Sequence, residues 1–259
     1  MKRLLTLQRL LYTIEVYYHG SDSLGAISIL ELTSRRNHKG RGSARDYVYD
    51  TLRSNILHLD LKPGTKMSEQ EVSDEFQVSR TPVREVFVHL LQDGLVEIYP
   101  QRGTYVSLIN LKGLEEGRFV RELMETAVIQ EAAGQLSKDD IFRLESNLAA
   151  QEISCRNKNY LQMLSLDDDF HATIFRACGK ERTWNMVQQL NYDFLRVRVL
   201  RLSHDFRWDT ILSQHRSIFD ALKKGDSQGA KSIMGEHLRL VIVEKEGLTS
   251  EYPEYFTDF

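Results

Sequence analysis

Proline is distributed unevenly along the chain, and this distribution constrains the fold more than any other feature. Three of the four prolines lie between residues 63 and 100, and the fourth is Pro253. The stretch from Gly113 to Gly247 therefore contains none. Since proline interrupts helices and the apolar residues of this stretch recur at spacings of three and four, we expect long helices here.

Six helical patterns divide this stretch, separated by polar or glycine-containing breaks. Short connections favour antiparallel packing of neighbouring helices into a bundle. The six patterns cover residues 115–135, 138–156, 159–178, 183–202, 208–223 and 227–246. The sequence thus predicts a mostly α protein with an antiparallel six-helix bundle in its C-terminal part.

Residues 43–108 carry a different pattern, beginning with a predicted helix over 44–58. Ser68, followed three residues later by Glu71, forms a capping box that begins a second helix. A third helix begins near Pro82, because proline is tolerated in a first turn.

Two weakly alternating segments, residues 95–99 and 104–108, follow this third helix and flank a turn, as in a β-hairpin. Three helices followed by two strands are typical of a winged helix-turn-helix domain.

The third helix has the polarity that a DNA-reading helix needs. Arg80 and Arg84 lie four residues apart, so they project from one side, where each guanidinium can bind a guanine edge through two hydrogen bonds. Hydroxyl side chains near a helix N-terminus can reach phosphates, and an arginine beside a glycine at the hairpin turn suits the minor groove. The expected contacts to double-stranded DNA are Ser79, Arg80, Thr81, Arg84, Arg102 and Gly103.

The charge of this block argues against DNA binding. Residues 43–108 hold seven basic and ten acidic side chains, a net charge of −3. The alternative is a winged helix that contacts only protein.

Four metal-ligating side chains are predicted to face the interior of the bundle. Asp167 and His171 lie four apart on one helix face. His215 and His237 lie on two other predicted helices among apolar neighbours. One carboxylate and three imidazoles suit a divalent ion, with zinc first and nickel, manganese, cobalt or iron as alternatives. The competing interpretation is that these are ordinary core histidines.

The segment Val-Ser-Arg-Thr-Pro-Val-Arg-Glu at residues 78–85 resembles the core of the GntR transcription-factor signature. The Leu-Lys-Pro-Gly segment at 61–64 and Arg102-Gly103 follow the same signature in order. This resemblance implies DNA binding by the helix and hairpin residues named above. The sequence departs from the signature at Gln70, where the family often has a basic residue, and at residues 72–73, where it usually has Leu-Ala.

The helical block resembles the FCD ligand-binding domain that accompanies this DNA-binding module. The resemblance rests on Val-Arg-Glu-Leu-Met-Glu at 120–125, Asp-Asp-Asp-Phe-His at 167–171, and the segments around the last two histidines. It implies that Asp167, His171, His215 and His237 hold the metal and that Arg121 binds an effector carboxylate. Arg121 could equally pair with Glu125 on its own helix. Six helices favour the VanR-type branch over the FadR type, and Lys180 stands where the family commonly has Asn.

Together these features predict a DNA-binding regulator, a repressor rather than an activator, and not an enzyme. It would act as a homodimer on a palindromic operator, with affinity set by a small organic acid bound at the metal and Arg121. One alternative is a regulator in which the ion itself is the signal. Another is a metal-dependent hydrolase fused to a DNA-binding domain, for which only Asp168 and Asp169 stand near the ligands as candidate bases.

We expect a cytoplasmic protein with no membrane contact, because no apolar run reaches membrane-spanning length and only two cysteines occur. The predicted organisation is an N-terminal extension, a winged helix-turn-helix domain, a linker, an effector-binding helical domain and a C-terminal tail. Their boundaries are 1–42, 43–108, 109–114, 115–247 and 248–259. Within the extension we expect a helix over 4–14, a strand over 26–32 and a basic linker over 34–43. The extension either touches DNA phosphates or is an incidental addition.

Overall fold

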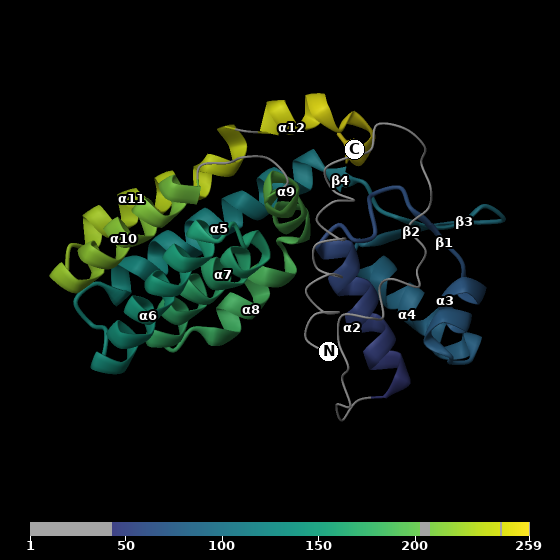
Figure 1. Ribbon diagram of the computed structural model, residues 1–259, viewed down its shortest axis with the longest axis horizontal. Coiled ribbons are helices and arrows are strands. Elements are labelled where there is room, and N and C mark those ends of the chain that lie inside the picture. The colour runs from purple at the N-terminus through teal and green to yellow at the C-terminus, as the bar shows by residue number, and fades with distance from the viewer. Residues whose placement is uncertain (1–42, 203–207, 244, 259) are drawn as a thin grey trace, which may run out of the picture. The chain divides into compact units, whose positions relative to one another are not determined.

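Figure 1 shows a computed structural model of the chain, which describes residues 43–202, 208–243 and 245–258. The helix, strand and basic linker expected before Ser43 lie outside these residues. Within them, no helix combines the length and the apolar character needed to cross a membrane. The fold is mostly α with small sheets, as predicted.

The N-terminal part of the described chain is a winged helix-turn-helix. Its helices are α2 (Ala44–Leu57), α3 (Glu69–Phe76) and α4 (Arg80–Gln92). Strands β2 (Val96–Tyr99) and β3 (Gly103–Val106) form the predicted antiparallel hairpin. A two-residue strand that the sequence did not indicate, β1 (Lys66–Met67), adds to β3, so the sheet order is β1-β3-β2.

Local sequence explains where these helices begin. Ser43 and Ser68 each accept a hydrogen bond from the amide three residues on, while Asp46 and Glu71 bond back to the capping residues' own amides. Ser79 caps α4 by position only, since its side chain makes no capping hydrogen bond. The hydroxyl of Ser79 therefore remains outside the helix's own hydrogen bonding.

In the described residues of the C-terminal part, seven helices follow one another and a short eighth comes after them. They are α5 (Leu111–Ala132), α6 (Lys138–Arg156), α7 (Tyr160–Ala177), α8 (Glu181–Gln189), α9 (Tyr192–Leu202), α10 (Trp208–Lys224), α11 (Ser227–Val243) and α12 (Lys245–Glu251). The C-terminal part is a helical bundle, as predicted. The single helix expected over 183–202 is divided into two helices, α8 and α9. The helix count that favoured the VanR-type branch is therefore not the count in the structure.

A tertiary contact accounts for this division. Where α5 crosses the α8–α9 junction, a Cβ on Gly117 would lie 3.1 Å from the carbonyl oxygen of Leu190 and 2.7 Å from Oδ1 of Asn191. The chain turns at this junction and α9 packs against α5. A periodicity read along a single segment contains no information about such a crossing.

The segment expected to be a linker is structured. Strand β4 (Ile109–Asn110) pairs in parallel with β5 (Phe256–Thr257) near the C-terminus, and α5 begins directly after β4. A 3-10 turn at Pro253–Tyr255 precedes β5. One buried apolar cluster joins these elements to α9 and α12; it contains Ile109, Leu114, Phe194, Val197, Leu200 and Leu248.

The main apolar core lies inside the helical part. It draws on α5, α6, α7, α8, α10 and α11, and its large members include Phe170, Phe175, Trp184, Ile218 and Leu222. This core surrounds the polar site described next, because His171 and His215 have no exposed surface.

Candidate metal and effector site

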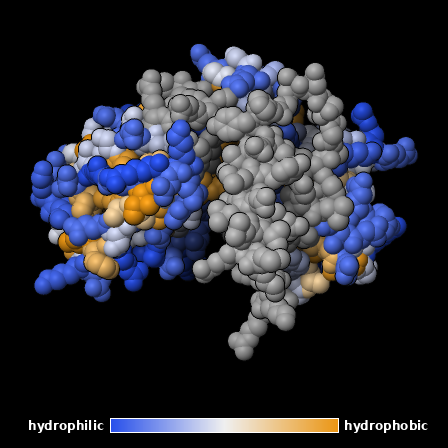
Figure 2. All heavy atoms as spheres, in the orientation of Figure 1, coloured by the Kyte–Doolittle hydropathy of each residue, from blue (hydrophilic) through white to orange (hydrophobic). Residues whose placement is uncertain are grey.

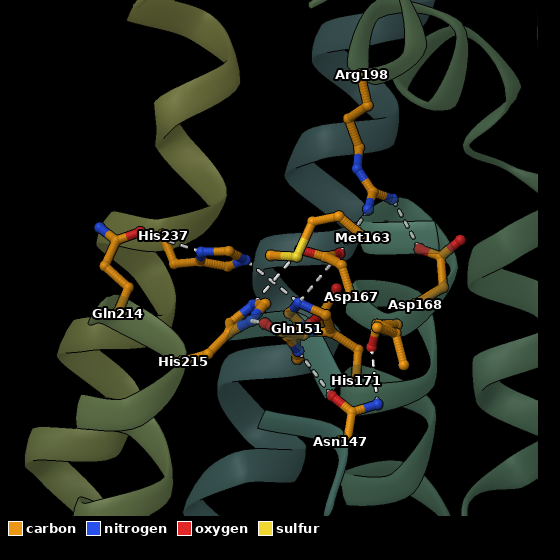
Figure 3. Close-up of polar contacts among 12 residues, drawn as sticks. Asn147, Gln151, Met163, Asp167, Asp168, His171, Arg198, Gln214, His215 and His237 are labelled. Atoms are coloured by element: carbon orange, nitrogen blue, oxygen red, sulfur yellow. Dashed lines mark hydrogen bonds and ion pairs between the residues drawn. The ribbon is translucent and has the colours of Figure 1, made fainter. Parts of the chain in front are cut away.

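The structure brings together the four side chains that the sequence singled out as metal ligands. Asp167 and His171 come from α7, His215 from α10 and His237 from α11, and one donor atom from each lies within 4.8 Å of the others. Figure 3 shows the three imidazoles and the carboxylate pointing toward one centre. All four are buried, and His237, the most exposed, retains only 8% of its accessible surface.

Each imidazole has its Nδ1 held by an oxygen outside the cluster. The Nδ1 of His215 lies 2.8 Å from Oε1 of Gln151, and that of His237 lies 3.1 Å from Oε1 of Gln214. The Nδ1 of His171 contacts the carboxylate of Glu125. Because these oxygens accept hydrogen bonds, each Nδ1 carries the proton and each Nε2 presents its lone pair to the centre.

The inward-facing atoms have no satisfactory partners among the described side chains. The Nε2 atoms of His171 and His237 lie 3.2 Å apart, so two ring nitrogens face each other. The Nε2 of His215 is buried, makes no hydrogen bond and lies 3.4 Å from Oδ1 of Asp167. Zinc bonds of about 2.0–2.1 Å to tetrahedral donors place those donors roughly 3.3 Å apart, so the residues fit a divalent cation.

The protonation states of the cluster also suit a cation. Burial lowers the pKa of His215 to about 3 even though Asp167 opposes the shift. Burial also holds the pKa of His237 well below its usual value, and the other two imidazoles add to the effect. Burial alone would raise the pKa of Asp167, but Arg198 and the imidazoles outweigh it and keep the pKa well below the ordinary range. Neutral imidazoles beside a charged carboxylate are the forms that bind metal.

The side chains expected to contact DNA lie on the surface of the winged helix-turn-helix. Ser79, Arg80, Thr81 and Arg84 are exposed at the start of α4. Arg102 is exposed at the hairpin turn, next to Gly103, whose φ is +115°. Arg84 donates two hydrogen bonds to the Glu69 carboxylate at 2.9 and 3.0 Å, so its guanidinium is already oriented at the helix face.

Comparison with known sequences decides the family. The profile of bacterial regulatory proteins of the gntR family matches residues 44–106, and that of the FCD domain matches residues 118–240. The chain belongs to the GntR family. It is 35% identical to the HTH-type transcriptional repressor RspR of Escherichia coli over 82% of this chain and 92% of that protein.

One further relative supports the assignment to the GntR family, and one solved structure shows the same fold. An HTH-type transcriptional regulator of Streptomyces ambofaciens is 33% identical over 84% of this chain and 91% of its own length. The solved structure of E. coli McbR/YncC shares the fold, with a TM-score of 0.68 and 19% identity, covering 82% of this chain and 99% of that one. This GntR-family chain is therefore a transcriptional regulator, and its relatives include a named repressor.

Arg198 of this GntR-family regulator is a site residue that the sequence did not reveal. It reaches from α9 to the carboxylate of Asp167 and, at 2.7 Å, to Oδ1 of Asp168 (Figure 3). Asp169 is held by Arg176 at 2.6 Å. Both carboxylates considered as hydrolytic bases are thus engaged in ion pairs.

Arg121, the residue expected to bind an effector carboxylate, lies beside the candidate metal ligands. It is buried and donates to Glu125, the pairing that the sequence left open, but its Nη2 is buried without a hydrogen-bond partner. A small pocket beside the metal ligands is lined by Arg121, Asp167, Phe194, Arg198, Arg201, Ile211, His237, Leu238 and Leu240. The pocket thus has cationic walls, from its arginines, and apolar walls next to the candidate metal ligands.

Proposed function

We propose that this regulator represses transcription by binding a palindromic operator as a homodimer, and that a small carboxylate bound at a divalent metal changes its operator affinity. Asp167, His171, His215 and His237 would hold the ion, with zinc first and nickel, manganese, cobalt or iron as alternatives. The observation that carries the proposal is the set of buried Nε2 lone pairs converging on one centre.

The effector would bind between this cluster and Arg121. A divalent ion held by these four residues would supply Lewis acidity toward a carboxylate. The unpaired Nη2 of Arg121 supplies a charge-assisted hydrogen bond to the same carboxylate. The apolar wall formed by Phe194 and Ile211 excludes water and strengthens both interactions.

For helix α4 and the β2–β3 hairpin we propose the DNA-binding roles that the resemblance to the GntR signature implies. Arg80 and Arg84 would bind guanine edges in the major groove, and Ser79 and Thr81 would bind phosphates. Arg102 and Gly103 would approach the minor groove. We assign residues 43–108 to DNA binding and 115–247 to effector binding.

The homodimer is supported by exposed apolar side chains on two neighbouring helices. Phe119 and Leu123 of α5 are 57% and 53% exposed, and Met186 of α8 and Leu190, directly after α8, are 44% and 55% exposed. Helices α5 and α8 contact each other, so a single partner surface could cover exposed apolar side chains from both. Figure 2 shows that hydrophobic residues gather in places among hydrophilic ones on the visible surface. A second copy covering this face would bury apolar area as interfaces do.

The metal assignment is tested by elemental analysis of the purified full-length chain and of a double variant, His215→Ala with His237→Ala. The expected result is about one divalent ion per chain in the parent and none in the double variant. His89→Ala is the matched control, because His89 is exposed and stacks on Tyr49 of the winged helix. Retention of stoichiometric metal by the double variant would refute the ligand assignment.

The repressor assignment is tested with DNA selected from a random library by the full-length protein. Arg84→Ala should weaken binding to the selected sequence about 5- to 150-fold, the value of one bidentate base contact, while leaving metal content intact. Unchanged affinity would remove α4 from the DNA interface.

One observation favours a second candidate, a regulator that responds to the ion itself. All four donors come from the protein, so the ion needs no organic ligand to complete a tetrahedral shell. This candidate predicts that affinity for the selected DNA follows free zinc concentration with no carboxylate present.

A further inference from the structure

Helix α9 contacts both the metal cluster and the winged helix-turn-helix. Arg198 engages Asp167 of the cluster. Two residues earlier, Arg196 donates from Nη1 to the carbonyl oxygen of Ser107 at 2.6 Å and from Nη2 to that of Leu108 at 3.1 Å. These two carbonyls directly follow strand β3 of the hairpin.

We propose that α9 transmits the state of the metal and effector site to the DNA-binding part, with Arg196 as the positioning residue that makes the connection. The inference rests on the function proposed above. It adds a physical route by which a ligand in the bundle reaches the wing.

The helical geometry gives α9 this role. Residues two apart on an α-helix point in nearly opposite directions, so Arg196 and Arg198 leave opposite sides of α9. A displacement of α9 caused at one arginine therefore moves the other with it. Arg196 is 1% exposed, and its planar guanidinium donates to two carbonyls at once. When α9 moves, these two bonds therefore move the end of the hairpin with it.

The cluster supplies a reason for α9 to move. Arg198 balances the charge of Asp167, and it also lines the pocket where a carboxylate would bind. A cation on Asp167 weakens the attraction between that carboxylate and Arg198, and an organic anion offers Arg198 a new partner. Binding of the cation or of the organic anion therefore changes the interactions of Arg198 and with them the preferred position of α9. A ligand shifts a protein between two arrangements only if it interacts differently with each, and Arg198 provides that difference.

A second contact joins α9 to α2. The hydroxyl of Tyr192 accepts hydrogen bonds from Nε and Nη2 of Arg53 at 3.3 and 3.2 Å. Just after α2, Leu59 adopts a left-handed φ of 61° and packs against the buried pair Leu164 and Val199. Leu164 in turn lines a pocket beside Asp167, so apolar packing runs from the site to the end of α2.

The test is hydrogen–deuterium exchange of the full-length chain with and without saturating zinc, with zinc affinity measured separately by chelator competition. In the parent, zinc should change amide exchange at least twofold in two regions, residues 105–110 and the end of α2. Arg196→Lys, which keeps the charge but loses the planar fork, should abolish the change at 105–110 while leaving the zinc affinity within twofold. Arg239→Lys is the matched control, because Arg239 forms an exposed ion pair with Glu122 on the bundle surface and should leave every response intact.

Tyr192→Phe keeps the proposal falsifiable if the buried Arg196 variant does not fold. It removes one hydroxyl and should abolish the zinc-dependent change at the end of α2. A parent chain that binds no zinc would overturn the metal site and this inference together. Two results would overturn this inference but not the metal site. One is a parent chain that binds zinc without a change in exchange at 105–110. The other is a variant that binds zinc and still shows the zinc-dependent change, at 105–110 for Arg196→Lys or at the end of α2 for Tyr192→Phe.

Discussion

Replacing Arg198 tests how the buried carboxylate of Asp167 is stabilised. The side chain of Arg198 is 11% exposed and that of Asp167 is 6% exposed. Arg198→Met fills a similar volume but leaves a buried carboxylate without its cation. Removing one partner of a buried ion pair costs about 3–5 kcal/mol, so we expect the metal-free protein to lose that much free energy of unfolding. For a chain of this size the loss corresponds to a fall in Tm of about 6–20 °C.

Zinc should reverse much of this loss, because the ion supplies the positive charge that Asp167 has lost. Binding at 100 times Kd stabilises a folded protein by about 2.7 kcal/mol, and the variant should gain at least as much as the parent. The assay is thermal unfolding after chelation and again with zinc. Arg176→Met is the matched control: Arg176 pairs with Asp169 in a half-exposed contact, so its loss should cost about 1 kcal/mol or less. The reasoning is refuted if Arg198→Met costs no more than this control, or if zinc fails to narrow the gap between variant and parent.

Further predictions concern the helix ends and crossings. Ser68→Ala removes the side-chain half of a capping box, the bond from the amide of Glu71, and should cost about 1 kcal/mol in denaturant unfolding, while Ser79→Ala, which loses no capping bond, should cost close to nothing. Equal effects would contradict the cap assignment. Gly117→Ala should destabilise by about 1–3 kcal/mol, since its Cβ would meet a backbone carbonyl at 3.1 Å. Gly247→Ala in α12 should stabilise the protein by about 0.5–1 kcal/mol, because the added Cβ meets no atom within 4 Å. If unfolding measurements show Gly247→Ala to be less stable than Gly117→Ala, the crossing of α5 over the α8–α9 junction is contradicted.

The winged helix was predictable because its signals are local. A capping box needs two residues three apart, and the hairpin needs alternation on either side of a turn, and both occur in residues 43–108. The four ligands were predictable as a set because Asp167 and His171 share one face and the FCD resemblance selected the other two histidines.

The supporting residues were not predictable from sequence. Gln151, Gln214 and Arg198 come from α6, α10 and α9, and an amide or guanidinium side chain has no spacing that marks it as a partner for an imidazole or carboxylate. The division between α8 and α9 depends on the approach of Gly117 from another helix. Two-residue strands such as β1 and β4 are too short to show periodicity.

Anomalous diffraction from crystals of the zinc-loaded protein tests the central claim most directly. The account predicts one strong peak at the zinc edge inside the bundle, about 2.0–2.1 Å from the Nε2 atoms of His171, His215 and His237 and about 2.0–2.2 Å from an oxygen of Asp167. A peak bound elsewhere, or a bundle without one, would contradict it.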